Sequence, residues 1–304
     1  MSEERKKAYL MMVLVIVIWG AGNVIIKYSL SFVSPATFLF WRFLITCWIF
    51  FPFYYKYVCN HDIGLKKILK GIVVGVLGVG LPLILFFEGL NQTTAIDASM
   101  LLVLSPLFVI AGGAMFLKEK VEKNEKIGIS IAVLGTIITV VQPYLEGVKT
   151  AEEGLIGNVL ILSASIISAF HLLYIKNRCK KYGPFFITAS GFMGSLVLVS
   201  IFFFFKSSSE AIFFPIEGWL GILYMSILGS VVAFSLRNKV VTQIEASESA
   251  VFAYLQPLIS VPLSYFWLKE VITLPFLVGG AVIVVGVIIA EFAKKKSKKI
   301  VLEG

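Results

Sequence analysis

The sequence predicts an all-α integral membrane protein with ten transmembrane helices, arranged as two inverted five-helix repeats. Hydrophobic residues make up 58% of the 304-residue chain, and the mean hydropathy is +0.92. A soluble domain of this size could not bury so much apolar surface. The apolar residues gather in ten runs, and the second half of the chain repeats the first at a constant spacing.

The ten expected helices follow the apolar runs, each near the roughly 20 residues that a bilayer requires. The first run follows Arg5-Lys6-Lys7 and has no convincing small-residue cleavage site, so we interpret it as a helix rather than a signal peptide. The connecting segments are short, and no separate soluble domain is expected. The runs lie near 8–27, 35–55, 68–90, 95–117, 127–143, 154–175, 184–205, 217–239, 247–268 and 275–293.

The repeat is clearest in residues 95–140, where several features recur 151 residues later without a gap. A fixed offset held over about 40 residues indicates duplication. We therefore expect two units, residues 1–148 and 149–304, each with five helices. The matching positions are Pro106 and Pro257, Lys118-Glu119 and Lys269-Glu270, Gly128 and Gly279, and Gly135 and Gly286.

The basic residues predict the topology. If the N-terminus is cytoplasmic, 22 of the 27 Lys and Arg residues fall inside and four outside, as the positive-inside rule requires. An odd number of helices per repeat makes the two repeats enter the membrane in opposite senses. Equivalent loops should then differ in charge, and segment 28–34 has no Lys or Arg whereas segment 176–183 has four. These patterns predict an inverted repeat in the cytoplasmic membrane, with both termini in the cytoplasm.

The net charge of +9 needs no nucleic-acid partner, because the cations flank apolar runs. The basic tail, 294–299, is interpreted as an anchor near anionic headgroups. The expected partners are the lipid bilayer and a small-molecule substrate, with no nucleic acid. We expect a monomer or a weak homodimer.

Several motifs resemble EamA-type carriers of the drug/metabolite transporter superfamily. They cover nearly the whole chain, and they are specific as a set. The resemblance implies ten helices, two EamA repeats, a central cavity and, often, export of amino acids or other small metabolites. The motifs are Trp19-Gly20-Ala21-Gly22-Asn23 with Lys27, Ser34-Pro35 with Arg42-Phe43, Ser105-Pro106, and Phe116-Leu117-Lys118-Glu119 with Gly128 and Gly135. The second repeat lacks the Trp-Gly and Arg-Phe elements, so the cavity need not be symmetric.

Polar residues within membrane helices are costly, so each is a functional candidate. Arg42 either binds a substrate carboxylate or is a structural arginine, paired with helix-end carbonyls or with Glu88. Trp19, Asn23 and Tyr254 are the residues that we expect in the cavity.

The ninth run carries small and polar residues on one helical face, with spacings of 4, 3, 4 and 4. Such a face either lets helices pack closely or lines a hydrated cavity. Gln256 is the best cavity candidate, because its amide is too large for tight packing. Pro106 and Pro257 should kink their helices at equivalent places. The residues of the face are Ser249, Ala253, Gln256, Ser260 and Ser264.

Ionisable residues near the helix ends are candidates for gating or proton coupling. We expect Lys27 and Asp97 to help close the outer mouth, and Lys176 and Glu248 to help close the inner one. The alternative is that all four are snorkelling or capping residues. His171 is either a proton relay or an interfacial histidine. Further candidate proton carriers are Glu88 and Asp97.

The sequence offers little for catalysis. No Gly-rich phosphate loop, metal-spaced His/Glu pair or Ser/His/Asp set is present, and Cys47, Cys59 and Cys179 show no metal or disulfide spacing. We expect no enzyme activity, no cofactor and no metal. The expected function is secondary transport by alternating access, most simply export of amino acids or related compounds. The alternatives are an importer, a membrane scaffold or receptor, and an intramembrane enzyme.

Overall fold

The computed structural model describes residues 3–61, 63–117, 123–145, 151–206, 213–244 and 246–303. These ranges contain helices and turns and no strand. Nine of the described helices are long and apolar enough to cross a bilayer, and a shorter apolar helix covers Leu274–Ile289. The protein is therefore an all-α membrane protein, and its helices overlap every apolar run that the sequence predicts.

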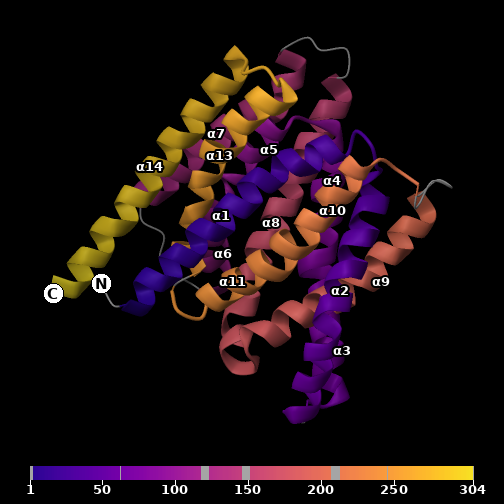
Figure 1. Ribbon diagram of the computed structural model, residues 1–304. Helices are drawn as coiled ribbons and strands as arrows, with labels where there is room; N and C mark the ends of the chain where they lie inside the picture. The colour runs from indigo at the N-terminus through magenta and orange to yellow at the C-terminus, as the bar shows by residue number, and fades with distance from the viewer. Residues whose placement is uncertain are drawn as a thin grey trace.

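The helices form one elongated bundle (Figure 1). Several apolar runs are divided into shorter helical pieces, which lie end to end. In chain order the elements are α1 (Glu3–Ser29), α2 (Pro35–Asn60), α3 (Leu65–Gly75), η1 (Val76–Gly80), α4 (Leu81–Gln92), α5 (Ala95–Leu102), α6 (Ser105–Leu117), α7 (Lys123–Leu145), α8 (Ala151–Tyr182), α9 (Pro184–Lys206), α10 (Ile216–Tyr224), η2 (Met225–Val232), α11 (Ala233–Val240), α12 (Ala246–Val251), η3 (Phe252–Leu255), α13 (Gln256–Leu263), η4 (Ser264–Leu268) and α14 (Leu274–Glu303).

Helix starts follow local capping chemistry. The Ser34 hydroxyl accepts a hydrogen bond from the Thr37 N–H at 3.3 Å, and Pro35 occupies the first position of α2. Thr94 caps α5 in the same way, through the Asp97 N–H at 3.0 Å. A hydroxyl cap satisfies a backbone donor that the first turn leaves without a partner, and proline at the first position has no N–H to satisfy.

Two π-helical segments occupy equivalent places in the two halves. Gly78 lies within η1 and Gly229 lies within η2, and the two glycines are 151 residues apart. Long π-helical segments are rare, and they are frequent at functional sites. The third apolar helix of each half is therefore irregular at its centre.

The fourth apolar helix of each half is interrupted just before a proline. In the first half α5 ends at Leu102, and Pro106 is the second residue of α6. In the second half a 3₁₀ turn, η3, precedes α13, and Pro257 is the second residue of that helix. Proline cannot donate a backbone hydrogen bond, and its ring restricts the preceding turn. Each interruption thus follows from the local sequence.

The fifth helices of the two halves, α7 and α14, pack together through glycines. Gly135 lies against Gly279 and Ile283, whereas Gly286 lies against Gly128 and Ala132. Residue numbers fall along α7 as they rise along α14, so the two helices run antiparallel. Small residues let membrane helices approach closely and gain packing energy.

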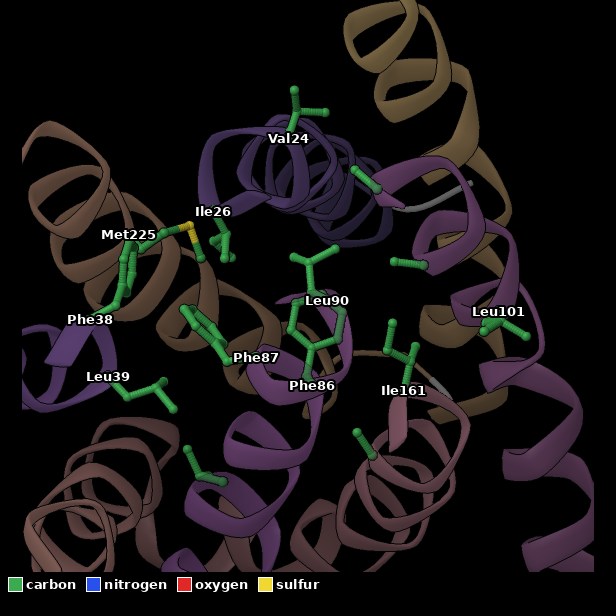
Figure 2. Packing of buried hydrophobic residues seen from close by; sticks show 14 of the residues in the cluster. Val24, Ile26, Phe38, Leu39, Phe86, Phe87, Leu90, Leu101, Ile161 and Met225 are labelled. Atoms are coloured by element: carbon green, nitrogen blue, oxygen red, sulfur yellow. The ribbon is translucent and has the colours of Figure 1, made fainter. Parts of the chain in front are cut away.

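The main buried cluster joins both halves near the end of α1. In Figure 2, Ile26 on α1, Phe87 and Leu90 on α4, and Met225 on η2 lie in one apolar cluster. Phe38 on α2 packs on Phe87 with ring centroids 5.0 Å apart. We call the end of the bundle where α1 begins the near end, and the end where α1 finishes the far end. The cluster also has members on α6, α8, α9 and α14, so it joins the two halves of the chain along much of the bundle.

Candidate functional site

A cavity of about 180 Å³ lies between the two halves. This volume accommodates on the order of ten water molecules, or a small organic molecule. Its walls come from α1, α2, η1, α4, α5 and α6 of the first half and from α8, η2, α11, α12, η3 and α13 of the second. It is mostly apolar with a few polar groups, which is the usual make-up of a ligand site.

The cavity extends to the near end of the bundle. Its lining includes Arg237, within the last turn before Val240, and Ser249, near the start of α12. That end is the near end, because Val240 packs in a buried cluster with Ala8 and Met12 of α1. Toward the far end the lining stops at Ile26 and Phe86. The cavity is therefore asymmetric along the bundle axis.

Arg42 is the most deeply buried charge in the cavity wall, with 1% of its surface exposed. Its Nε donates to the Ser230 hydroxyl at 2.9 Å, and its guanidinium carbon lies 5.6 Å from the Phe87 ring centroid. Its Nη1 has no hydrogen-bond partner among the described residues. The expected pairing with helix-end carbonyls or Glu88 is wrong for this structure, because the long side chain reaches Ser230, near the middle of the 216–240 span.

Two further buried polar groups line the same cavity. Asn23 on α1 and Ser165 on α8 are 4% and 2% exposed. The Asn23 Nδ2 and the Ser165 Oγ make no hydrogen bond within the described part of the chain. A buried polar group without a partner costs roughly 1–3 kcal/mol. Three such groups at one cavity are thus available to a ligand or to water.

Trp19 lies between the middle of the cavity and its near-end mouth. Its Nε1 donates to the Gly229 carbonyl at 3.1 Å, and its ring meets Phe234 edge-on with centroids 5.2 Å apart. The Arg237 guanidinium lies 5.9 Å from the Trp19 ring centroid. Trp19 therefore fixes α1 against η2 and α11 and positions one face beside a second arginine.

Arg237 is a site residue that was not among the candidates chosen from the sequence. In the structure it is half-buried and lines the cavity. It lies on α11, which continues to Val240, so its side chain belongs to a membrane helix. Its position inside the apolar run 217–239 was the signal available in the sequence.

The polar face of the ninth apolar helix has two uses, one in each half of its length. Ser249, Ala253 and Gln256 line the cavity, and Gln256 is 5% exposed. Farther along, the Ser260 hydroxyl donates to the Gly20 carbonyl of α1 at 2.8 Å. The same face therefore lines the cavity in the part of the helix closer to the near end. In the part closer to the far end, it packs closely against α1.

Tyr254 does not join the residues expected around the cavity. It lies in η3 between two lining positions, Ala253 and Gln256, and packs against the main apolar cluster. Tyr254 is not among the residues that line the cavity. The expectation that Tyr254 lines the cavity is therefore wrong for this structure.

The far end is closed by contacts that hold the α4–α5 connection. The Lys27 Nζ donates to the carbonyls of Leu90 at 2.9 Å and Asn91 at 3.2 Å. The Glu270 carboxylate accepts from the N–H groups of Ala95 at 2.9 Å and Ile96 at 3.0 Å. A cation thus caps the end of α4 and an anion caps the start of α5, as the helix dipoles favour.

A second set of polar groups ties α5 to α7 and α8. The Thr93 hydroxyl lies 2.7 Å from Asn158 Oδ1 and 3.3 Å from Asp97 Oδ2. The Asn158 Nδ2 donates to the Thr139 carbonyl at 3.1 Å. Asp97 itself is 3% exposed. The far-end closure therefore joins α1, α4, α5, α7, α8 and the segment after η4.

The other gating candidates lie apart from the cavity. His171 on α8 lies against Gly78 and, with Lys70 and Arg178, lines a second cavity of about 50 Å³. Glu88 and Lys176 are half-buried on α4 and α8. The side chain of Glu248 lies outside those that the structure describes. Among the described residues, no three His, Cys, Asp or Glu residues gather where they could hold a metal.

The chain matches proteins classed as transporters. The model of the EamA-like transporter family matches residues 6–141 and 155–292. A Bacillus subtilis protein described as an uncharacterized transporter, YyaM, is 24% identical over 93% of this chain and 93% of its own length. An uncharacterized transporter of Archaeoglobus fulgidus is 24% identical over 93% of this chain and 98% of its own.

One solved crystal structure has the same fold, with a TM-score of 0.66 at 16% identity. The superposition covers 94% of this chain and 98% of that chain. The two segments matched by the family model correspond to the two halves that build the cavity. The chain belongs to the EamA-like transporter family and is a multi-pass membrane transporter.

Proposed function

We propose that the protein is a secondary transporter that works by alternating access and exports a small organic metabolite across the cytoplasmic membrane. Amino acids and related compounds are the proposed substrates. The observation that carries the proposal is the cavity, which both halves build and which reaches the near end while polar contacts close the far end. An access pathway that reaches one side only is what a carrier requires.

The proposed mechanism rests on an inverted repeat of residues 1–148 and 149–304. Support comes from the antiparallel α7–α14 contact, the matched π-helices and the matched breaks before Pro106 and Pro257. Exchange of conformation between two related halves converts a cavity open at one end into one open at the other. The irregular third and fourth helices are the proposed hinges.

The proposed substrate site is the cavity-lining set of Trp19, Asn23, Arg42, Ser249 and Gln256. The proposed far-end gate comprises Lys27, Asp97 and Glu270, whose contacts hold α4 and α5 together. Lys176 and Glu248 are proposed for the near-end gate, from their places in the repeat. Opening the far end requires the Lys27 and Glu270 contacts to break.

Flux measurements separate this proposal from its alternatives. The purified protein is reconstituted into liposomes in a known orientation. The liposomes are loaded with amino acids or related metabolites, and efflux and uptake of each compound are recorded. Saturable efflux supports the exporter, and saturable uptake from the far side alone supports an importer. Chemical conversion without flux supports an enzyme, and binding without flux supports a scaffold or receptor.

A further inference from the structure

We infer that the transported molecule is a small organic anion that carries a carboxylate, and that Arg42 and Arg237 attract and hold it. This inference rests on the proposed transport function and narrows its substrates from amino acids and related compounds to related carboxylates without an ammonium group. Both arginines line the cavity between the two halves. None of the described residues that line it is an aspartate or a glutamate. The described wall is therefore positively charged.

The free-energy cost of burying Arg42 without a counter-charge favours a bound anion. A buried arginine without a counter-charge is expensive, because desolvation of its guanidinium is not repaid by an ion pair. Arg42 is 1% exposed, and within the described part of the chain its side chain donates to the neutral Ser230 hydroxyl. The Nη1 edge remains unpaired within the described structure. A ligand carboxylate would supply both the missing charge and the missing acceptor.

The neighbouring donor supports the same ligand chemistry. Asn23 lines the cavity with an unpartnered Nδ2, which can only donate. Ser165 adds a hydroxyl without a partner in the described structure, which can also donate. An anion accepts from all of these groups, whereas an ammonium group, which only donates, would find no carboxylate among the described lining residues.

The two arginines lie at different depths. The Arg42 side chain reaches Ser230. Arg237 lies seven residues after Ser230 on the eighth apolar helix, which contains both residues. At 1.5 Å per residue the separation along the axis is roughly 10 Å, toward the near end. We assign Arg237, beside Trp19, to attraction of the anion at the near-end mouth, and Arg42 to its deeper site.

The remaining lining favours an organic carboxylate over inorganic phosphate. Ile16, Ile26, Leu83, Phe86 and Phe234 line the cavity, and no lysine stands among the described lining residues. Inorganic phosphate has no apolar part that could fill this share of the wall. An apolar body with a carboxylate at one end matches both parts of the wall.

A ligand series that varies only in charge tests the inference. The probes are an amino acid, its α-keto acid and its decarboxylated amine, in sets with aliphatic, aromatic and acidic side chains, together with inorganic phosphate. Binding is measured as the rise in unfolding temperature of the purified wild-type protein, since a ligand that binds only the folded state stabilises it. We expect the α-keto acid to bind tightest in at least one set. A preference for the amine, the zwitterion or phosphate, or no stabilising anion, overturns the inference.

Variants locate the site. Arg237→Gln should weaken anion binding about tenfold or more, because it removes a charged partner. Lys239→Gln is the matched control, since Lys239 is exposed two residues away and lies outside the lining. Arg42→Lys tests the deep position, and its failure to fold would leave Arg237→Gln decisive. Equal affinities in Arg237→Gln and Lys239→Gln overturn the assignment.

Flux separates this inference from the transport proposal. Saturable flux of an amine or a zwitterion in preference to the α-keto acid retains the transporter and overturns the anion class. Anion binding that depends on Arg237, without flux of any compound, retains the anion site and overturns the transporter.

Discussion

Gly135 on α7 lies directly against Gly279 on α14. The residues equivalent to these two in the repeat form a second contact between the same helices. An offset of 151 residues carries Gly135 to Gly286 and relates Gly279 to Gly128, and Gly286 does lie against Gly128. The interface is therefore unchanged when the two halves are exchanged. We call this close-fitting interface of α7 and α14 the seam.

The seam predicts that alanine substitution at its two related glycines lowers stability by similar amounts. A Cβ at position 135 would lie 2.7 Å from the Ile283 backbone nitrogen, and one at position 286 would also meet backbone. Gly135→Ala and Gly286→Ala should each lower the unfolding free energy by about 1–3 kcal/mol, in spite of alanine's better helix propensity. Thermal unfolding of the purified variants in detergent measures the effect.

Gly64→Ala is the control for these substitutions, because a Cβ there meets nothing within 4 Å. Its backbone φ of −61° suits alanine, so its stability should be unchanged or slightly higher. If the seam variants unfold at the same temperature as Gly64→Ala, the close packing of α7 on α14 is refuted.

Gln256→Ala should reduce transport more than it reduces stability. Gln256 is buried in the cavity wall, whereas Leu258 on the same helix is 71% exposed. We expect the initial transport rate to fall about tenfold for Gln256→Ala, because a buried polar contact to substrate is lost. Leu258→Ala should transport normally. Loss of folded Gln256→Ala protein with full activity in the remainder would assign Gln256 to packing.

Glu270→Gln should make the cavity more accessible from the far end. The carboxylate caps α5 through two N–H groups, and an amide keeps only one acceptor without the charge. A several-fold shift toward the far-open state is expected if the two states are nearly balanced. An impermeant thiol reagent reports it, through Ala253→Cys in a background without Cys47, Cys59 and Cys179.

Lys269→Asn controls for loss of a charge at the same loop. Lys269 is exposed and has a φ of 59°, a left-handed conformation that asparagine tolerates. Asp97 and Glu248 occupy equivalent positions in the repeat. Asp97→Asn and Glu248→Gln should therefore shift the accessibility of the cavity cysteine to the thiol reagent in opposite directions. A shift in the same direction, or none, would reject the gate residues.

The topology is a separate prediction. Single cysteines in place of Lys149 and Lys206 should react with an impermeant reagent from outside intact cells. Cysteines in place of Lys123 and Lys180 should react only after permeabilisation. Labelling of position 123 from outside would contradict both the orientation and the inverted repeat.

Hydropathy and the repeat predict most of the fold. Every apolar run became helix, because runs near 20 residues long leave few alternatives in a bilayer. The helix ends were less accurate: α8 extends through Tyr182, seven residues beyond the expected end at 175. The π-helices η1 and η2 were not predicted, since glycine in an apolar run has no signal that distinguishes a π-turn from an α-turn.

The cavity residues were partly predictable. Trp19, Asn23, Arg42, Ser249 and Gln256 line it, because polar side chains in a membrane helix face the protein interior. Tyr254 does not, since its direction depends on the 3₁₀ turn before Pro257. Arg237 was not among the candidates, because its place near the end of the run 217–239 was read only as a topology signal. Glu270 was visible as a repeat match, but its role as a helix cap requires the three-dimensional approach of Ala95.

Counterflow in proteoliposomes tests the central claim most directly. Vesicles are loaded with an excess of the unlabelled α-keto acid that stabilises the protein best, and a trace of the labelled compound is added outside. A carrier with alternating access should accumulate the label transiently above its external concentration, and Arg237→Gln should lose this overshoot while Lys239→Gln keeps it. Equilibration without an overshoot, or no entry of label, would contradict the account.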